Sequence, residues 1–226
     1  MVGGRGSSFG GSGEGNDTEV YDWLAHLGET RGKLQPIDIA KYQGQSLEQI
    51  ERRLRILKHE EAFVFDKNGS VIAAYKGNAH SVALPAELLQ EKDIMVTHGH
   101  PKSTAEFGGT FSFADMRNML KSNWAEHRAT AGGQGEMNYI LRKTPKADAE
   151  GFYNQINRDY VDLRQQMQNK YDAAYKQEKD KGSDMPKVLH RARQEAVGVL
   201  NAYYKNTAEK YGYEYVARKK DYKYGR

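Results

Sequence analysis

Cysteine is absent from this sequence of 226 residues, and so are long apolar runs. The lack of cysteine excludes disulfide bonds and thiolate metal sites, so any metal ion must be held by histidine and carboxylate side chains. No stretch approaches the roughly 18 apolar residues that a membrane-spanning helix needs, and no signal-peptide core is present. Composition therefore predicts a soluble protein without disulfides.

Charge is modest, with a formal net charge of +4, 28% charged residues and 38% hydrophobic residues. These values are polar for a globular protein but do not indicate disorder throughout. The basic excess is concentrated in the last ten residues, where Asp221 is the only acid and the bases are Arg218, Lys219, Lys220, Lys223 and Arg226. We interpret this segment as a solvated basic tail, and nucleic-acid binding is the weaker alternative.

The chain divides by composition into four segments. Residues 1–16 are rich in glycine and serine and predict a flexible leader. Residues 17–35 form a short N-terminal segment, with a weak amphipathic turn or short helix between Asp17 and Lys33. Residues 36–147 predict a sheet domain, and residues 148–226 predict a helical hairpin with the basic tail.

Residues 36–147 predict, in order, a helix, a hairpin, a strand, a helix, a strand, a helix and a strand. Ser46 and Gln49 form a capping box before a helix that should end near His59. The remaining expected elements are a hairpin of 63–65 and 71–75 around the turn 66–69, a strand at 81–84, a helix after Pro85, a strand at 94–100, a helix after Ser112, a glycine turn at 132–135 and a strand at 137–142.

Apolar residues recur every three or four positions from Phe152 to Ala174, which predicts a long amphipathic helix. The sequence Gly-Ser-Asp at 182–184 interrupts this pattern, and Pro186 suits the first turn of a second helix. That helix should end at Gly212, giving an antiparallel hairpin. We interpret its many tyrosines as packing residues.

Two histidines follow a short apolar strand at 94–96. Alternate residues of a strand point to the same face, so His98 and His100 should project together before Pro101 ends the strand. Asp115 can be brought back to them by the following turn. Two imidazoles and a carboxylate match the ligands of a catalytic zinc site, which leaves its fourth position to water.

The residues Thr97-His98-Gly99-His100-Pro101 and Phe111-Ser112-Phe113-Ala114-Asp115 resemble a motif of the JAB/MPN (JAMM) metallopeptidase family, nearest to its RadC-like and phage-encoded members. Two departures stand out. Gly99 replaces the usual asparagine or serine, and the spacer of residues 102–111 has ten residues, longer than is typical. Because this spacer contains Gly108-Gly109, we expect its extra length to loop out without moving the ligands.

The resemblance implies an α+β fold of the JAB/MPN-like (cytidine-deaminase-like) type, a mixed sheet with flanking helices, to which this chain adds its C-terminal hairpin. It also implies zinc and a glutamate general base at the start of an early strand. Glu60 and Glu61 both qualify; Glu60 is preferred because Ala62 and Val64 share its face. Ser112 would either donate to the oxyanion or only cap its helix.

These features predict a zinc-dependent amide or isopeptide hydrolase, encoded by a phage or mobile element, that acts on a protein or peptide. The alternative is a non-catalytic structural or interaction module, such as a phage-particle component or toxin-like effector, whose hairpin contacts a larger assembly. Either protein would be cytoplasmic or virion-associated, without a membrane partner. The other histidines lack partner spacing and are assigned to the surface: His26, His59, His80, His127 and His190.

Overall fold

The structure is a computed structural model that describes residues 34–79, 81–101, 109–132 and 137–219. Several expectations lie outside these residues: the leader at 1–16, the short helix within 17–33, most of the spacer before Gly109, most of the glycine turn and the end of the basic tail. Among the described helices, none combines the length and apolar character needed to cross a membrane.

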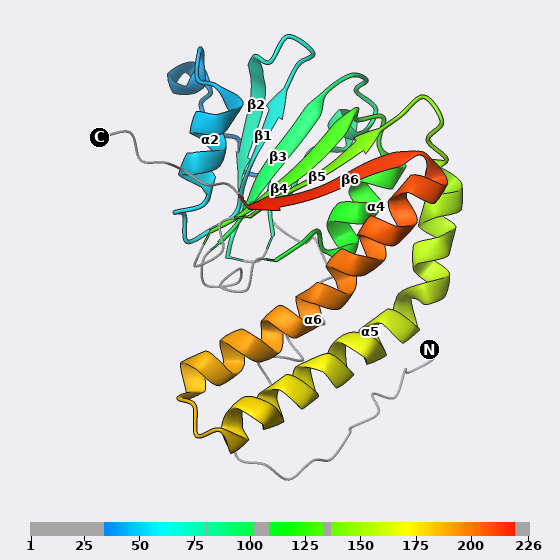
Figure 1. Cartoon of the computed structure of the whole chain (residues 1–226). Helices are drawn as coiled ribbons and strands as arrows, with labels where there is room; N and C mark the ends of the chain where they lie inside the picture. Colours follow the sequence, from blue (N-terminus) through cyan, green and yellow to red (C-terminus); the bar gives the residue numbers. More distant parts are fainter. Residues whose placement is uncertain (1–33, 80, 102–108, 133–136, 220–226) are drawn as a thin grey trace, which may run out of the picture.

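A six-stranded mixed sheet forms the centre of the fold, in the order β2-β1-β3-β4-β5-β6 (Figure 1). The pair β3–β4 is parallel and the other four pairs are antiparallel. The predicted α+β class is therefore confirmed. The strands are β1 (Glu61–Phe65), β2 (Val71–Lys76), β3 (Met95–His100), β4 (Glu126–Ala131), β5 (Met137–Lys143) and β6 (Tyr213–Lys219).

Helices cover both faces of the sheet. Helix α2 (Leu47–Leu54) lies on one face, and α4 (Phe113–Lys121) lies on the other with the hairpin of α5 (Ala149–Asp180) and α6 (Met185–Ala208) (Figure 1). Short 3-10 helices occupy Ala40–Tyr42, Ala86–Leu89 and Glu209–Tyr211. The capping boxes predicted at Ser46 and Ser112 are both present, although α2 ends at Leu54, before the expected His59.

The prediction of strands from the sequence is wrong at residues 81–84, and it misses two strands of the sheet. Residues 81–84 form no strand; Ser81 instead donates its backbone N–H to the side chain of Asn78 in a turn. Strands β4 and β6 were not expected. Strand β4 has the sequence Glu-His-Arg-Ala-Thr-Ala, which lacks an apolar run, yet five of its six residues are buried. Strand β6 follows the hairpin, where the sequence predicts only a basic tail.

A polar layer, made of the residues Glu51, Arg55, Arg128, Thr130 and Asn138, lies between α2 and the sheet. All five side chains are buried. Arg128 Nε donates to Glu51 at 2.6 Å, Asn138 donates to the other Glu51 oxygen at 2.7 Å, and Arg55 Nε donates to Thr130 at 2.8 Å. Because these groups satisfy one another, polar residues of β4 can be buried in the middle of the sheet.

Helix α2 lies so close to β3 that only glycine fits between them at position 99. A Cβ on Gly99 would lie 2.9 Å from Leu54 Cβ and 3.1 Å from the Leu54 carbonyl oxygen. The same helix end approaches Gly132, where a Cβ would lie 2.2 Å from the Arg55 carbonyl oxygen. The packing of α2 against β3 therefore requires glycine at position 99.

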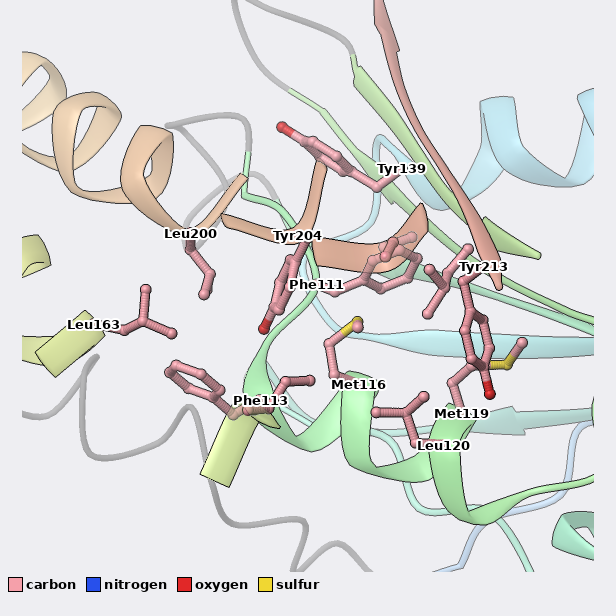
Figure 2. Close-up of a cluster of buried hydrophobic side chains, with 14 of the residues drawn as sticks. Phe111, Phe113, Met116, Met119, Leu120, Tyr139, Leu163, Leu200, Tyr204 and Tyr213 are labelled. Carbon is pink, nitrogen blue, oxygen red and sulfur yellow. The ribbon is translucent and has the colours of Figure 1, made fainter. Parts of the chain in front are cut away.

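The hydrophobic core on the other face joins the hairpin to the sheet. Helix α4 contributes Phe113, Met116, Met119 and Leu120, which face Leu163 of α5, Leu200 and Tyr204 of α6, and Tyr213 of β6 (Figure 2). The predicted antiparallel hairpin is confirmed, and Gly212 follows it with a φ of 72°. The end of the hairpin at which α5 connects to α6 extends beyond the sheet (Figure 1).

Candidate metal centre

The predicted ligands His98, His100 and Asp115 come together at the end of β3. Because β3 and β4 are parallel, the chain crosses between them through α4, and this helix begins near the point where β3 ends. The two Nε2 atoms of His98 and His100 lie 2.9 Å apart. Asp115 places Oδ1 3.3 Å from His98 Nε2 and Oδ2 3.5 Å from His100 Nε2.

The spacing of these atoms fits a single metal ion. Ligand atoms at about 2.0–2.2 Å from a tetrahedral zinc ion lie roughly 3.3–3.6 Å from one another. The two imidazole–carboxylate distances, 3.3 and 3.5 Å, agree with this value, and the imidazole–imidazole distance of 2.9 Å is somewhat shorter. The group could therefore hold a metal ion after a small adjustment of the rings.

A second combination of ligands, His98, Asp115 and His127, also has its atoms within 4.8 Å of one another. His127 Nε2, however, lies 3.2 Å from Nδ1 of His98, whereas His100 and Asp115 approach the opposite nitrogen, Nε2. One imidazole directs only one nitrogen at a given ion. We therefore favour His98, His100 and Asp115 as the ligands, with His127 behind His98.

Each candidate imidazole ligand has a partner on its outer nitrogen, as metal-bound histidines usually do. His98 Nδ1 contacts His127 Nε2, and His100 Nδ1 lies 3.3 Å from the carbonyl oxygen of Gly109. In the metal-bound site each ring would carry its proton on Nδ1 and donate it outward, which would leave both Nε2 lone pairs for the ion. The sequence predicts neither of these partners, His127 and the Gly109 carbonyl.

The assignment of His127 to the surface is wrong. Its side chain is buried beside Phe111 and Trp124, with ring centroids 5.1 and 5.2 Å away. Burial lowers the pKa of His127 to about 3, so the ring is neutral and can accept a hydrogen bond from His98. No local pattern indicates this contact, because the two residues are 29 positions apart and meet through the packing of the parallel strands.

Asp115 is ionised and faces a partly open side of the site. Burial alone would raise its pKa, but the charges and hydrogen bonds of His98 and His100 outweigh this effect and hold the pKa of Asp115 well below its usual range. The side chains of His100 and Asp115 are 13% and 17% exposed, and that of His98 is 3% exposed. Solvent can therefore reach the group from the side of His100 and Asp115.

The two candidate bases have different surroundings. The register that pairs Ala62 with His98 brings Glu60 opposite His100 on the same face of the sheet. Burial raises the pKa of Glu60 to about 8, with His100 lowering it and Asp115 raising it further. Glu61 points to the other face, where Arg53 and His59 each lie 2.9 Å from its carboxylate. Glu60 alone is therefore directed toward the candidate ligands.

Ser112 serves as the cap of α4. Its hydroxyl accepts the Asp115 backbone N–H at 3.1 Å and donates its own proton to Asp115 Oδ2 at 2.8 Å. Its backbone N–H donates to the same oxygen, also at 2.8 Å. Ser112 thereby orients the carboxylate. Its hydroxyl would have to give up the hydrogen bond to Asp115 before it could donate to an oxyanion.

Comparisons with protein-family models, curated proteins and solved structures give no match for this chain. Any function proposed for it is therefore carried by the geometry of the site.

Proposed function

We propose that this chain is a zinc-dependent hydrolase of amide or isopeptide bonds, of the JAB/MPN (JAMM) type in both fold and chemistry. One observation carries the proposal. Two imidazole nitrogens and a carboxylate converge within 3.5 Å on a partly open side of the sheet, and a separate buried carboxyl group, Glu60, interacts electrostatically with His100 and Asp115. A structural zinc site would need four protein ligands and no additional base.

The donor set suits zinc. Two neutral imidazoles and one carboxylate are common ligands of catalytic zinc sites, and the outer partners His127 and Gly109 support the required tautomers. When bound, zinc supplies a water of lowered pKa and polarises the carbonyl group under attack. The protein contributes the orientation of His98, His100 and Asp115 and the low polarity of the surroundings.

Glu60 would move the proton. During hydrolysis of an amide, a C–O bond forms to water and the C–N bond breaks, so one proton must pass from the water to the departing amine. With a pKa of about 8 in the metal-free protein, Glu60 is mostly protonated at pH 7. A zinc ion beside it would favour the carboxylate, which is the form that takes the proton and later returns it. Ser112 would keep Asp115 in place while this happens.

A second candidate function is a non-catalytic module within a larger assembly, such as a phage particle. Two observations favour it. The proton of Ser112 is already donated to Asp115, and the hairpin of α5 and α6 extends beyond the sheet, where it offers a surface to a protein partner (Figure 1). In this case the metal would only stabilise the fold.

The decisive experiment combines zinc binding with hydrolysis of a library of peptides and lysine-linked isopeptides. We expect Glu60→Gln to retain zinc but lose at least about 100-fold in rate, since general acid–base catalysis contributes about 10²–10⁴-fold. Glu61→Gln is the matched control and should retain most of the rate. If the two variants keep the same activity, Glu60 is not the base; if no substrate is cleaved by the zinc-loaded protein, the non-catalytic function is favoured.

Measuring zinc binding in the same experiment distinguishes the ligand set His98, His100 and Asp115 from the set His98, Asp115 and His127. His100→Ala should abolish stoichiometric zinc binding. His127→Gln should weaken it by about 10–100-fold, as is typical for the loss of an outer partner. The reverse ranking would assign His127 to the metal and overturn the proposed ligand set.

A further inference from the structure

A chain of three polar side chains connects the C-terminal part of the molecule to the loop that precedes α4. Tyr215 of β6 donates its hydroxyl proton to Asn201 Oδ1 of α6 at 2.6 Å. The same hydroxyl lies 2.7 Å from the hydroxyl of Thr110. A phenol has a single proton, so Thr110 must be the donor to the oxygen of Tyr215. Thr110 is itself buried, which fixes the geometry of this chain.

Thr110 sits between the two loop residues that organise the metal centre. On one side, the carbonyl oxygen of Gly109 accepts from His100 Nδ1. On the other side, Ser112 holds the carboxylate of Asp115. A shift of the Thr110 backbone would therefore move an acceptor of one candidate ligand and the cap of another.

Packing reinforces this connection. Phe111 lies between the two regions, with its ring centroid 5.1 Å from that of His127 and 6.3 Å from that of Tyr215. The loop is thus held by His127 on the side of the sheet and by Tyr215 on the side of the hairpin. None of these hairpin or β6 residues belongs to the motif that suggested the metal site.

We infer that Tyr215 is a positioning residue of the metal centre: through Thr110 it holds the Gly109 carbonyl against His100, so that the C-terminal strand completes the site. This inference rests on the metal-binding part of the proposed function. It changes the role of the C-terminal region, which becomes a structural requirement of the centre in addition to any contact with a partner.

The test is the zinc affinity of the full-length chain, measured by competition with a chromogenic chelator. We expect Tyr215→Phe to raise the dissociation constant for zinc about tenfold, at the lower end of the effect of outer partners. Tyr213→Phe is the matched control, because it removes a buried hydroxyl from the same strand that has no hydrogen-bond partner within the described residues. The control should stay within about twofold of the wild type.

A second variant tests the route through Thr110. Thr110→Val removes the donor with little change in shape and should weaken zinc binding to a similar extent. The double variant Thr110→Val/Tyr215→Phe should be no weaker than either single one, because both remove the same hydrogen bond. Independent, multiplying effects would contradict the proposed connection.

A readout without zinc separates positioning from general destabilisation. In the metal-free protein, the ¹⁵N resonance of His100 Nδ1 should lose its hydrogen-bonded character in Tyr215→Phe and keep it in Tyr213→Phe. If wild-type protein binds no zinc, the proposed function fails, and the His100 resonance still decides the inference. If zinc binds normally and both tyrosine variants behave alike, the inference is overturned while the proposed function stands.

Discussion

Glu60 and Glu61 are neighbours in the chain whose environments differ because successive strand residues face opposite sides of a sheet. Glu61 forms an ion pair with Arg53 and contacts the His59 ring near α2. Glu60 instead lies buried on the face of His100, near the carboxylate of Asp115. One step along the backbone thus separates an ion-paired carboxylate from one that is buried beside the candidate ligands.

The raised pKa of Glu60 predicts how the stability of the metal-free protein depends on pH. Between about pH 4.5 and 8 the folded state keeps a proton on Glu60 that the unfolded state has lost. The stabilising contribution is therefore complete below pH 4.5 and disappears as the pH rises through 8. We expect a loss on the order of 4 kcal/mol over this range.

Urea unfolding of the wild type and of Glu60→Gln at pH 5 and pH 8.5, both with chelator present, measures this contribution. Groups that titrate in both proteins cancel in the comparison. The wild type should lose more stability than the variant on going to the higher pH. Equal losses would mean that Glu60 is ionised in the folded protein at neutral pH.

Some site residues could be predicted from the sequence and others could not, for a physical reason. His98 and His100 share a face because of strand alternation, and Ser112 and Asp115 meet through a capping box, so both pairs are encoded within a few positions. His127 joins the site only through strand pairing. Its neighbours along the chain carry no motif that points to the candidate metal centre.

At the scale of the elements, local signals predicted the capped helices and the first hairpin, and failed for β4 and β6. Strand β4 is polar in sequence because its buried Arg128 and Thr130 find partners on α2 and β5. Strand β6 lies at the edge of the sheet and ends within the predicted basic tail, at Arg218 and Lys219. Both strands form through contacts with segments distant in the sequence, which no short window contains.

The close approach of α2 to β3 predicts a strong effect of a single methyl group. Gly99→Ala would bring a Cβ within 2.9 Å of Leu54, so the helix must move away from the sheet. We expect a loss of about 1–3 kcal/mol in the free energy of unfolding, as for other overpacked sites. Denaturant unfolding followed by circular dichroism measures this change.

Gly198→Ala provides the matched control in α6, where a Cβ would meet nothing within 4 Å. Alanine is favoured over glycine inside a helix, so this variant should gain about 0.5–1 kcal/mol. A Gly99→Ala protein as stable as the wild type would mean that α2 is free to shift.

At the scale of the whole molecule, the hairpin and the sheet share one hydrophobic core. Residues of α4, α5, α6 and β6 pack together in it (Figure 2). The base of the hairpin is also joined to the chain after β5 by hydrogen bonds from Thr144 to the Gly212 carbonyl and from Asp148 to the Tyr211 carbonyl. The segments 36–147 and 148–226, which differ in composition, are therefore interdependent in packing.

This shared core predicts a single unfolding transition. Trp124 is fully buried in the core and reports on the sheet, whereas far-UV circular dichroism is dominated by α5 and α6. In a Trp23→Phe background, tryptophan fluorescence and circular dichroism should give coincident urea transitions, as expected for two-state unfolding. Two separated transitions would show that the hairpin folds on its own.

The polar layer beneath α2 constrains how this sequence can diverge. Removing one member, for example Glu51, would leave the buried Arg128 with Glu126 as its remaining carboxylate partner and would take away the acceptor of the Asn138 amide, at a cost on the order of 3 kcal/mol. Replacing the whole set by apolar residues would be far less harmful. Among natural variants of this chain, positions 51, 55, 128, 130 and 138 should therefore covary as a block, and intermediates with a single replacement should be rare.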